Sequence, residues 1–282
     1  MVTINSTLIS GAGAIHSLAP LLAGKKNLLL VSDANVIKLA ATQQILALLA
    51  ADDRHVEIID NVPPEPSQHD VAKIMANAPA SAFDLIVGIG GGSVLDVTKL
   101  LSVLYHPRSP GLDALLEGVK PVERIASLLI PATAGTGSEA TPNAILAIPE
   151  QDTKIGIISP VLLPDYVALL PELTTSMPAH IASSTGIDAL CHLIECFTAT
   201  IANPVSDNVA LTGLRKLLHN IETAVNEPHN LVARLEMLWA SYYGGAAITH
   251  AGTHLVHALS YPLGGKYHLP HGVANAILLA RA

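Results

Sequence analysis

The chain has 282 residues, half of them apolar and 3% aromatic, and carries a formal net charge of -8 at pH 7. This apolar content is enough to bury one large or two medium cores, which argues against a disordered chain. The acidic balance, with no basic cluster beyond Lys25 and Lys26, argues against nucleic acid and against an anionic membrane surface as partners.

The first half of the chain alternates predicted strands and helices. Short apolar runs at 27–32 and 56–60 indicate strands, and apolar residues recur at helical spacing over 36–49 between them. Ser67, which follows a proline-rich segment, is placed to cap a further helix that we expect to reach Met75. This alternation is typical of an α/β domain.

A glycine-rich turn follows the next predicted strand. The apolar run 85–89 leads directly into the turn 90–93 and then into a helical pattern. A strand, a glycine turn and a helix in this order present backbone N–H groups and a helix dipole to a phosphate, and a Cβ would hinder that approach. The turn matches neither the dinucleotide fingerprint in its usual place nor a Walker loop, so a purely structural turn is the alternative.

A second loop of small and hydroxyl-bearing residues, 132–141, follows the predicted strand 125–131. Its hydroxyls and uncrowded backbone suit contacts to phosphate, ribose or nicotinamide. Because both loops follow parallel-type strands, they predict a nucleotide cleft between them. From about Thr174 the pattern becomes almost continuously helical, so we expect an α/β domain at 1–175 and a helical domain at 176–282.

The helical part contains several side chains of the types that bind divalent metals. Asp188 and His192 lie four residues apart, so both project from one face of a predicted helix and could chelate one ion. For this pair alone, a hydrogen-bonded aspartate and a satisfied core histidine are the slightly favoured alternative. His257 and His271 lie in two further short segments. Spacing alone leaves the ligand set open, because three helices could each carry surface histidines.

The only two cysteines, Cys191 and Cys196, lie five residues apart on one predicted helix, where their Cβ vectors diverge too far for a disulfide. The N-terminus lacks the positive region and compact apolar run of a signal peptide, and no window is apolar for long enough to form a membrane span. We therefore expect a soluble, cytoplasmic protein.

Taken together, the motifs resemble those of the iron-containing, group III alcohol dehydrogenases. The resemblance is carried by the segments 90–99, 133–139, 185–195 and 257–275, together with Lys154, and it runs essentially from end to end of the chain. It implies a Rossmann-like α/β nucleotide-binding domain followed by an all-α metal-binding domain, which is the dehydroquinate synthase-like fold.

The resemblance also implies a metal centre. Asp188, His192, His257 and His271 would hold the metal, which is usually ferrous iron and in some members zinc. His257, His271 and Tyr261 would be the catalytic residues, at a site where the metal stabilises alkoxide character while hydride passes to or from the nicotinamide.

Cofactor contacts follow from the same resemblance. Asp33 matches the position near the adenosine ribose, where a carboxylate would accept a hydrogen bond from the 2′-hydroxyl and repel a 2′-phosphate. We therefore expect NAD rather than NADP. The other implied contacts are Gly91, Gly92, Ser93, Asp96, Thr133, Thr136, Ser138, Lys154 and Leu173.

Three departures from the family pattern stand out. Tyr261 replaces a histidine of many relatives, and a phenol with a pKa of about 10 is a weaker base at neutral pH. Glu65 and Leu170 stand where relatives often have Asn and Asp. The chain ends at Ala282, whereas family members continue through further helices, so we expect the C-terminal part of the helical domain to be missing and an apolar surface to be exposed.

The favoured function is that of an NAD-dependent, metal-activated alcohol dehydrogenase or aldehyde reductase. Its substrate would be a small primary alcohol, diol or semialdehyde. The resemblance also implies a homodimer. Among enzymes, a glycerol dehydrogenase, a hydroxyacid-oxoacid transhydrogenase or a dehydroquinate synthase-like enzyme is the alternative. A truncated, catalytically silent nucleotide-binding protein is the alternative from another class.

Overall fold

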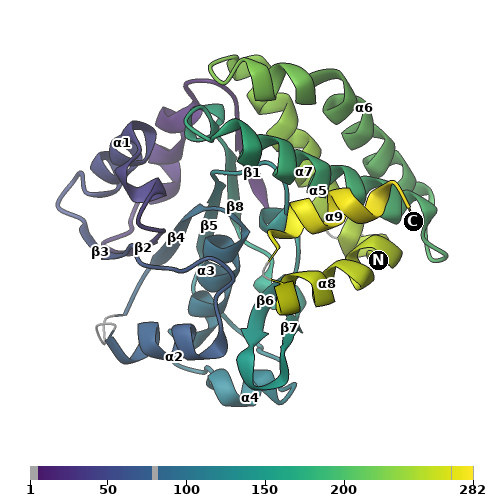
Figure 1. The fold of residues 1–282 in the computed structure, drawn as a ribbon. Helices are drawn as coiled ribbons and strands as arrows, with labels where there is room; N and C mark the ends of the chain where they lie inside the picture. Colours follow the sequence, from purple (N-terminus) through teal and green to yellow (C-terminus); the bar gives the residue numbers. More distant parts are fainter. Residues whose placement is uncertain (1–5, 78–81, 268, 282) are drawn as a thin grey trace. The chain divides into compact units, whose positions relative to one another are not determined.

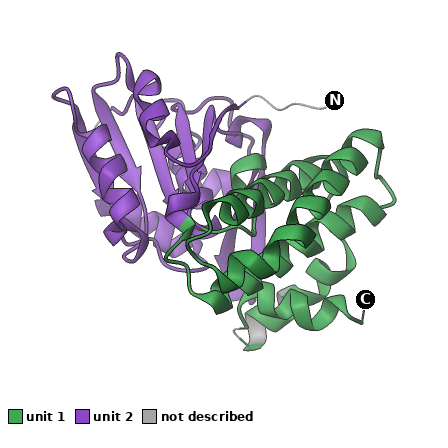
Figure 2. Cartoon of the chain, turned by 90° about the horizontal axis from the view of Figure 1, so that it is seen from above, with its two compact units in different colours: residues 1–4, 133–141, 174–282 green, residues 5–132, 142–173 purple. Residues whose placement is uncertain are grey.

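The computed structural model describes residues 6–77, 82–267 and 269–281 of the chain. These residues form two compact units, which Figure 2 shows in different colours. The α/β unit consists of residues 6–132 and Pro142–Leu173, and the helical unit consists of Thr133–Thr141 and residues 174–281. The short segment 133–141 is thus grouped with helices that follow it much later in the sequence.

The α/β unit is built on six strands, β1 (Thr7–Ser10), β2 (Asn27–Val31), β3 (His55–Ile59), β4 (Leu85–Gly90), β5 (Ser127–Pro131) and β8 (Tyr166–Leu169). They form one parallel sheet in the order β1-β8-β5-β4-β2-β3 (Figure 1). Two further strands, β6 (Asn143–Ile148) and β7 (Thr153–Ile158), form a separate antiparallel hairpin.

Helical segments cover both faces of the sheet, and its central strands β2, β4 and β5 are buried on both sides. In β2, Leu28 and Leu30 belong to one core, and Leu29 and Val31 belong to the other. The first core includes residues of η1 (Ala14–Leu22) and α1 (Ala40–Leu49); the second includes residues of α2 (Gln68–Asn77), α3 (Gly92–Leu104), α4 (Leu112–Leu116) and the β6–β7 hairpin. Shorter 3-10 turns are η2 (Val36–Lys38), η3 (Ser138–Ala140), η4 (Pro149–Gln151), η5 (Pro160–Leu162) and η6 (Pro171–Thr174).

The contact between β4 and α3 is close enough to require glycine. A Cβ on Gly88 would lie 2.4 Å from Oγ1 of Thr98, and a Cβ on Gly90 would lie 2.5 Å from Cβ of Val94. Both glycines therefore allow α3 to pack directly on the strand that precedes it. This packing places the first turn of α3 at the carboxyl end of the central part of the sheet.

The described part of the helical unit contains five α-helices: α5 (Ala179–Thr198), α6 (Pro204–Asn226), α7 (Leu231–Ala251), α8 (Leu255–Tyr267) and α9 (His271–Leu279). Side-chain caps define where two of them start. Asn203 and Ser206 form a capping box at α6, and the Asn230 side chain accepts a backbone N–H at α7. Gly252, with a φ of 68°, follows the end of α7 and turns the chain toward α8.

The segment Thr133–Thr141 packs against α7 of the same unit. Gly137, with a φ of 59°, donates its backbone N–H to Oγ of Ser241 over 3.1 Å. A Cβ on Gly245 would lie only 2.0 Å from the carbonyl oxygen of Gly137. The close approach of this loop to α7 therefore depends on the absence of a side chain at position 245.

The predicted fold class is confirmed, with a parallel sheet covered by helices followed by a helical part. The predicted helix over 36–49 is interrupted, because Leu39 has an extended backbone with a ψ of 140° and separates η2 from α1. Ser67 caps α2 as expected: its Oγ accepts the N–H of Asp70 over 3.2 Å, and its own N–H donates to the Asp70 carboxylate over 2.9 Å. Among the described residues, none of the helices is both long and apolar enough to cross a membrane.

Replacing Gly245 with alanine should destabilise the protein by roughly 2 kcal/mol or more, because the new methyl group would overlap the Gly137 carbonyl and force the loop or the helix to move. Gly244 provides a matched control on the same helix. A Cβ there would meet its nearest neighbour at 3.4 Å, so Gly244→Ala should be neutral or slightly stabilising through its higher helix propensity. Urea unfolding measures both changes, and equal losses in the two variants would contradict this account of the packing.

Candidate functional site

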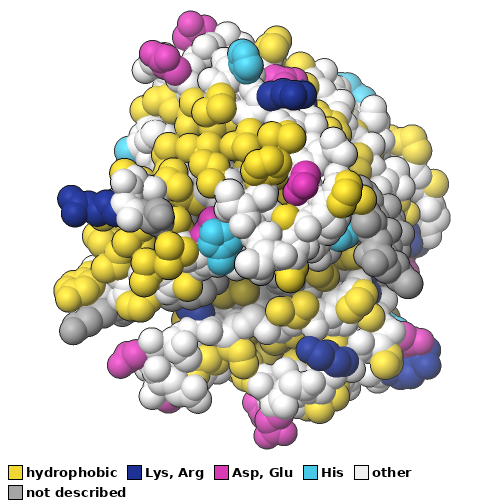
Figure 3. Space-filling view, turned by 90° about the vertical axis from the view of Figure 1, so that its right-hand side faces the viewer, with side chains coloured by type: hydrophobic (Ala, Val, Ile, Leu, Met, Phe, Trp, Pro, Cys, Tyr) yellow, Lys and Arg dark blue, Asp and Glu magenta, His cyan; other side chains and the backbone are white. Residues whose placement is uncertain are grey.

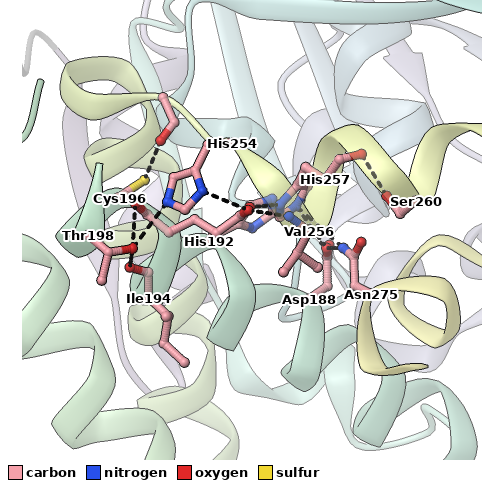
Figure 4. Close-up of polar contacts among 12 residues, drawn as sticks. Asp188, His192, Ile194, Cys196, Thr198, His254, Val256, His257, Ser260 and Asn275 are labelled. Carbon is pink, nitrogen blue, oxygen red and sulfur yellow. Dashed lines mark hydrogen bonds and ion pairs between the residues drawn. The ribbon is translucent and has the colours of Figure 1, made fainter. Parts of the chain in front are cut away.

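Two of the predicted metal ligands lie one turn apart on α5. Asp188 and His192 are both buried, and Nε2 of His192 lies 3.9 Å from Oδ1 of Asp188. Their spacing of four residues places both side chains on one face of the helix, as the sequence predicts. Figure 4 shows the two side chains close to His257, which comes from α8.

The other two predicted ligands meet the same carboxylate. Nε2 of His257, in α8, and Nε2 of His271, the first residue of α9, each lie 3.5 Å from Oδ1 of Asp188. The ring of His257 also stacks on that of His192, with centroids 4.4 Å apart and an angle of 17° between the planes. Three helices therefore bring these side chains to Asp188, although His271 lies outside the group whose ligand atoms are all within 4.8 Å of one another.

The arrangement fits a single divalent ion. Atoms bound at about 2.1 Å to a tetrahedral metal lie about 3.4 Å from one another, which is close to the distances around Asp188. One potential ligand atom from each of Asp188, His192 and His257 lies within 4.8 Å of the other two. Three imidazoles and one carboxylate are ligands that suit ferrous iron or zinc.

Burial and mutual proximity set the charges of these groups. Burial disfavours the charged form of Asp188, yet the surrounding imidazoles hold the pKa of this carboxyl well below its usual range. Burial lowers the pKa of His192 to about 4, so this ring is neutral at physiological pH and offers a lone pair. Burial also opposes protonation of His257, but its hydrogen bonds to Asp188 and Glu195 raise the pKa to about 9. A bound metal ion would therefore compete with a proton for His257.

Glu195, for which the sequence predicts no role, lies behind His257. It is only 1% exposed, and its carboxylate is hydrogen-bonded to Nδ1 of His257. Burial favours the neutral carboxyl, but the hydrogen bond with His257 outweighs it and the pKa of Glu195 is lowered. The signal was present in the sequence, because Glu195 lies three residues after His192 and seven after Asp188, on the same face of α5.

Asn275 was likewise not assigned a role. Its Nδ2 lies 2.7 Å from Oδ1 of Asp188 and 3.4 and 3.3 Å from the Nε2 atoms of His257 and His271 (Figure 4). The side chain is fully buried, so it holds the Asp188 carboxylate in a fixed orientation. Its position four residues after His271, one turn along α9, is the signal that could have identified it.

Tyr261 lies in α8, and His254 lies in the turn just before it. Tyr261 is predicted to be catalytic, but its side chain is outside the described residues and its role stays a prediction. His254 lies beside Glu195 and Thr198, with ring nitrogens 3.5 Å from Oε1 and 3.1 Å from Oγ1 respectively. The imidazole of His254 therefore contacts the carboxylate that supports His257.

Neither cysteine has the properties of a nucleophile. Cys191 and Cys196 are free and buried, and burial raises the pKa of each thiol to about 12. Both thiols are therefore protonated at neutral pH. The Cys196 thiol donates to the backbone carbonyl of Gly252 over 3.2 Å, which links α5 to the turn between α7 and α8.

In the α/β unit, Glu65 makes polar contacts with Ser93, in the predicted phosphate turn, and with Lys154. The backbone N–H of Glu65 donates to Oγ of Ser93 over 3.1 Å, and the Glu65 carboxylate pairs with Nζ of Lys154 at 3.0 Å. Gly91 precedes the first residue of α3, Gly92, and the first N–H groups of a helix have no partner within that helix. This end of the helix suits an anion.

The two acidic residues predicted to contact the cofactor already have partners in the protein. Oδ1 of Asp33 accepts the backbone N–H groups of Asn35 and Val36 over 2.9 and 3.0 Å. Asp96 is buried, pairs with Nζ of Lys99 at 2.8 Å and accepts a backbone N–H from β6 over 3.0 Å. Asp96 therefore fastens α3 to the hairpin.

The remaining predicted cofactor residues divide between the two units. Thr133, Thr136 and Ser138 lie in the loop that packs on α7, where the N–H of Ser138 donates to Oγ1 of Thr136 over 3.3 Å. Leu173 is 1% exposed and belongs to the core of the α/β unit. Their contacts with a nucleotide stay predictions.

Comparisons with known proteins agree with this picture. The profile described as iron-containing alcohol dehydrogenase matches residues 5–171, and the profile of the C-terminal region of the Fe-containing alcohol dehydrogenase family matches residues 182–282. The long-chain-alcohol dehydrogenase 1 of Geobacillus thermodenitrificans is 37% identical over 274 residues, which are 95% of this chain and 69% of that protein.

Solved structures agree in fold. An iron-containing alcohol dehydrogenase from Thermotoga maritima superposes with a TM-score of 0.91 at 32% identity, over 99% of this chain and 77% of that one. A sulfoacetaldehyde reductase from Bifidobacterium kashiwanohense, solved in complex with NAD+, gives a TM-score of 0.90 at 27% identity, over 99% and 74% of the two chains. The two profile matches, which together span most of the sequence, show that this chain belongs to the iron-containing alcohol dehydrogenase family.

Proposed function

We propose that this chain transfers hydride between NAD and a small primary alcohol, diol or semialdehyde at a centre that holds ferrous iron. The observation that carries the proposal is the convergence of Asp188, His192, His257 and His271 within a family of alcohol dehydrogenases. A 1-propanol dehydrogenase of Citrobacter freundii and a solved 1,3-propanediol oxidoreductase among its relatives support small alcohols and diols as this class of substrate.

The residues of the centre have distinct tasks in this proposal. A bound ferrous ion, or zinc in its place, would supply a Lewis acid that stabilises alkoxide character on the substrate oxygen. Asp188 offers the one anionic ligand, and Asn275 keeps that carboxylate oriented. We assign to Tyr261 the exchange of a proton between the substrate oxygen and solvent, in place of the histidine that the family often has there.

For the cofactor, we assign the pyrophosphate to the first turn of α3, where the helix dipole and the N–H groups of the helix start favour an anion. A domain of residues 1–175 would then bind the dinucleotide, and a helical domain of residues 176–282 would bind the metal. The solved relative in complex with NAD+ supports this cofactor. The proposed contacts are Asp33, Gly91, Gly92, Ser93, Asp96, Thr133, Thr136, Ser138, Lys154 and Leu173.

The function is tested first by following the absorbance of NADH with a panel of short aldehydes. The protein is purified without oxygen and assayed with added ferrous iron, with zinc, or with a chelator. We expect turnover that requires the metal and stops with the chelator. A protein that binds both NADH and metal but consumes no NADH with any aldehyde would contradict the dehydrogenase proposal and favour the catalytically silent alternative.

Removing Asp188 tests the ligand set. Asp188→Ala should lower the affinity for zinc or ferrous iron at least about 100-fold, because the only anionic ligand is lost and three imidazoles remain. Metal content after dialysis against a chelator provides the measurement. Asp113→Ala, at an exposed position in α4, is the matched control and should retain its metal. Equal metal content in the two variants would rule out the four-ligand centre.

The preference for NAD is tested by Asp33→Asn. This substitution removes the negative charge but keeps an oxygen that can accept the N–H groups of Asn35 and Val36. The ratio of the dissociation constants for NADPH and NADH should fall about tenfold or more, because a 2′-phosphate is no longer repelled. Fluorescence titration measures both constants, with Asp113→Asn as control. An unchanged ratio would show that Asp33 does not select the cofactor.

We also propose that the protein is a cytoplasmic homodimer. Large apolar side chains are exposed in the helical unit, among them Phe197, Ile201 and Leu218, and Figure 3 shows apolar side chains gathered on one face. The two free, buried cysteines fit a reducing compartment. Light scattering of the purified protein should give twice the mass of one chain, whereas a single-chain mass at micromolar concentration would argue against the dimer.

A further inference from the structure

The Glu195 carboxylate connects the proposed metal centre to the start of α8. One of its oxygens, Oε2, is hydrogen-bonded to Nδ1 of His257, and the other, Oε1, accepts the backbone N–H of Val256 over 2.5 Å. The side chain is 1% exposed, so water does not compete for these bonds. The two partners are adjacent in sequence, and Glu195 binds them from a different helix.

The two contacts have separate physical effects. Val256 is the second residue of α8, and the first N–H groups of a helix have no partner within the helix. The carboxylate satisfies one of them and places a negative charge at the positive end of the helix dipole. The turn before α8 is also fixed, because the Cys196 thiol of α5 donates to the carbonyl of Gly252.

When a metal ion displaces one proton from the His257 ring, the contact with Glu195 decides which ring nitrogen keeps the other. An ionised carboxylate has acceptors only, so Nδ1 of His257 must donate to it. In a neutral imidazole the other nitrogen, Nε2, then keeps its lone pair. Nε2 is the atom that faces Asp188 at 3.5 Å, at the point where the four proposed ligands meet.

We propose that Glu195 is a positioning residue that fixes His257 in the Nδ1-protonated tautomer and anchors the first turn of α8, so that Nε2 is directed at the metal. This inference rests on the proposed metal centre. It adds a carboxylate behind one of the imidazole ligands, and such a partner both orients a ligating ring and increases its basicity. The position of His257 and the start of its helix then depend on the same side chain.

The substitution that tests this role is Glu195→Gln, which keeps the size of the side chain. If the amide oxygen keeps the bond to Val256, the amide N–H₂ faces Nδ1 of His257 and forces the ring proton onto Nε2. If the amide turns over, the helix start loses its acceptor. In both cases the dissociation constant for zinc should rise about 10- to 100-fold, measured by competition with a coloured chelator.

Two variants separate positioning from general damage. Glu195→Asp restores the charge with a shorter side chain and should recover part of the zinc affinity. Glu236→Gln removes a carboxylate of α7 that pairs with Lys216 at 2.6 Å, and it should leave zinc affinity unchanged. Equal zinc affinity in Glu195→Gln and the unaltered protein would overturn the proposal.

A measurement on the unaltered protein tests the tautomer directly and does not depend on how a variant folds. In zinc-loaded protein labelled with nitrogen-15 in histidine, the magnetic resonance spectrum should show a proton on Nδ1 of His257 and none on Nε2. A spectrum with Nδ1 bound to zinc would overturn the inference while leaving the metal centre intact. If the unaltered protein binds neither zinc nor ferrous iron, the proposed function fails, and this inference fails with it.

Discussion

The helical unit holds one negative charge, that of Asp188, away from water, and the helices around it must supply its partners. Asp188 is 3% exposed, and a buried carboxylate without partners would cost several kcal/mol or would take up a proton. Imidazoles from α5, α8 and α9 surround it, and the amide of Asn275 donates to it. Because these groups come from three helices, the helices must converge for the charge to be tolerated. Against the effect of burial, hydrogen bonds to Asp188 and Glu195 raise the pKa of His257, so a proton on this ring would balance the charge of Asp188, and a divalent ion would compete with that proton.

The sequence predicted those helices and strands whose apolar residues follow the same pattern as their burial in the structure. Fully buried β4 and the helix that follows it were recognised, as was the cap at Ser67. The hairpin β6–β7 was not predicted, although Pro149 and Asp152 mark its turn, because burial alternates along β6 but not along β7. The helical spacing over 36–49 was real, but extended backbone at Leu39 divides it, and nothing in the apolar pattern marks that break.

Some residues of the candidate site could be predicted from the sequence, but the contacts between separate elements could not. The spacing of Asp188 and His192 allowed a chelating pair but did not favour it, and the full ligand set needed the family resemblance, since no local pattern relates His257 and His271 in separate helices. Glu195 and Asn275 share helix faces with proposed ligands, so helical spacing from those ligands is enough to identify both. For Asp96, the ion pair with Lys99 is a local feature, but its bond to β6 joins residues 49 positions apart, and such contacts cannot be read from spacing.

The grouping of the loop 133–141 with the helical unit affects how the protein can be divided. The chain passes from one compact unit to the other after Ala132, after Thr141 and again after Leu173, so no single cut separates two complete units. A fragment that begins at residue 176 would lack the loop 133–141, and the backbone of α7 around Gly245, against which this loop packs, would be exposed. The helical unit is therefore not a self-contained module. A gene fusion or domain exchange that transfers only the C-terminal half would also have to include a segment equivalent to the loop 133–141.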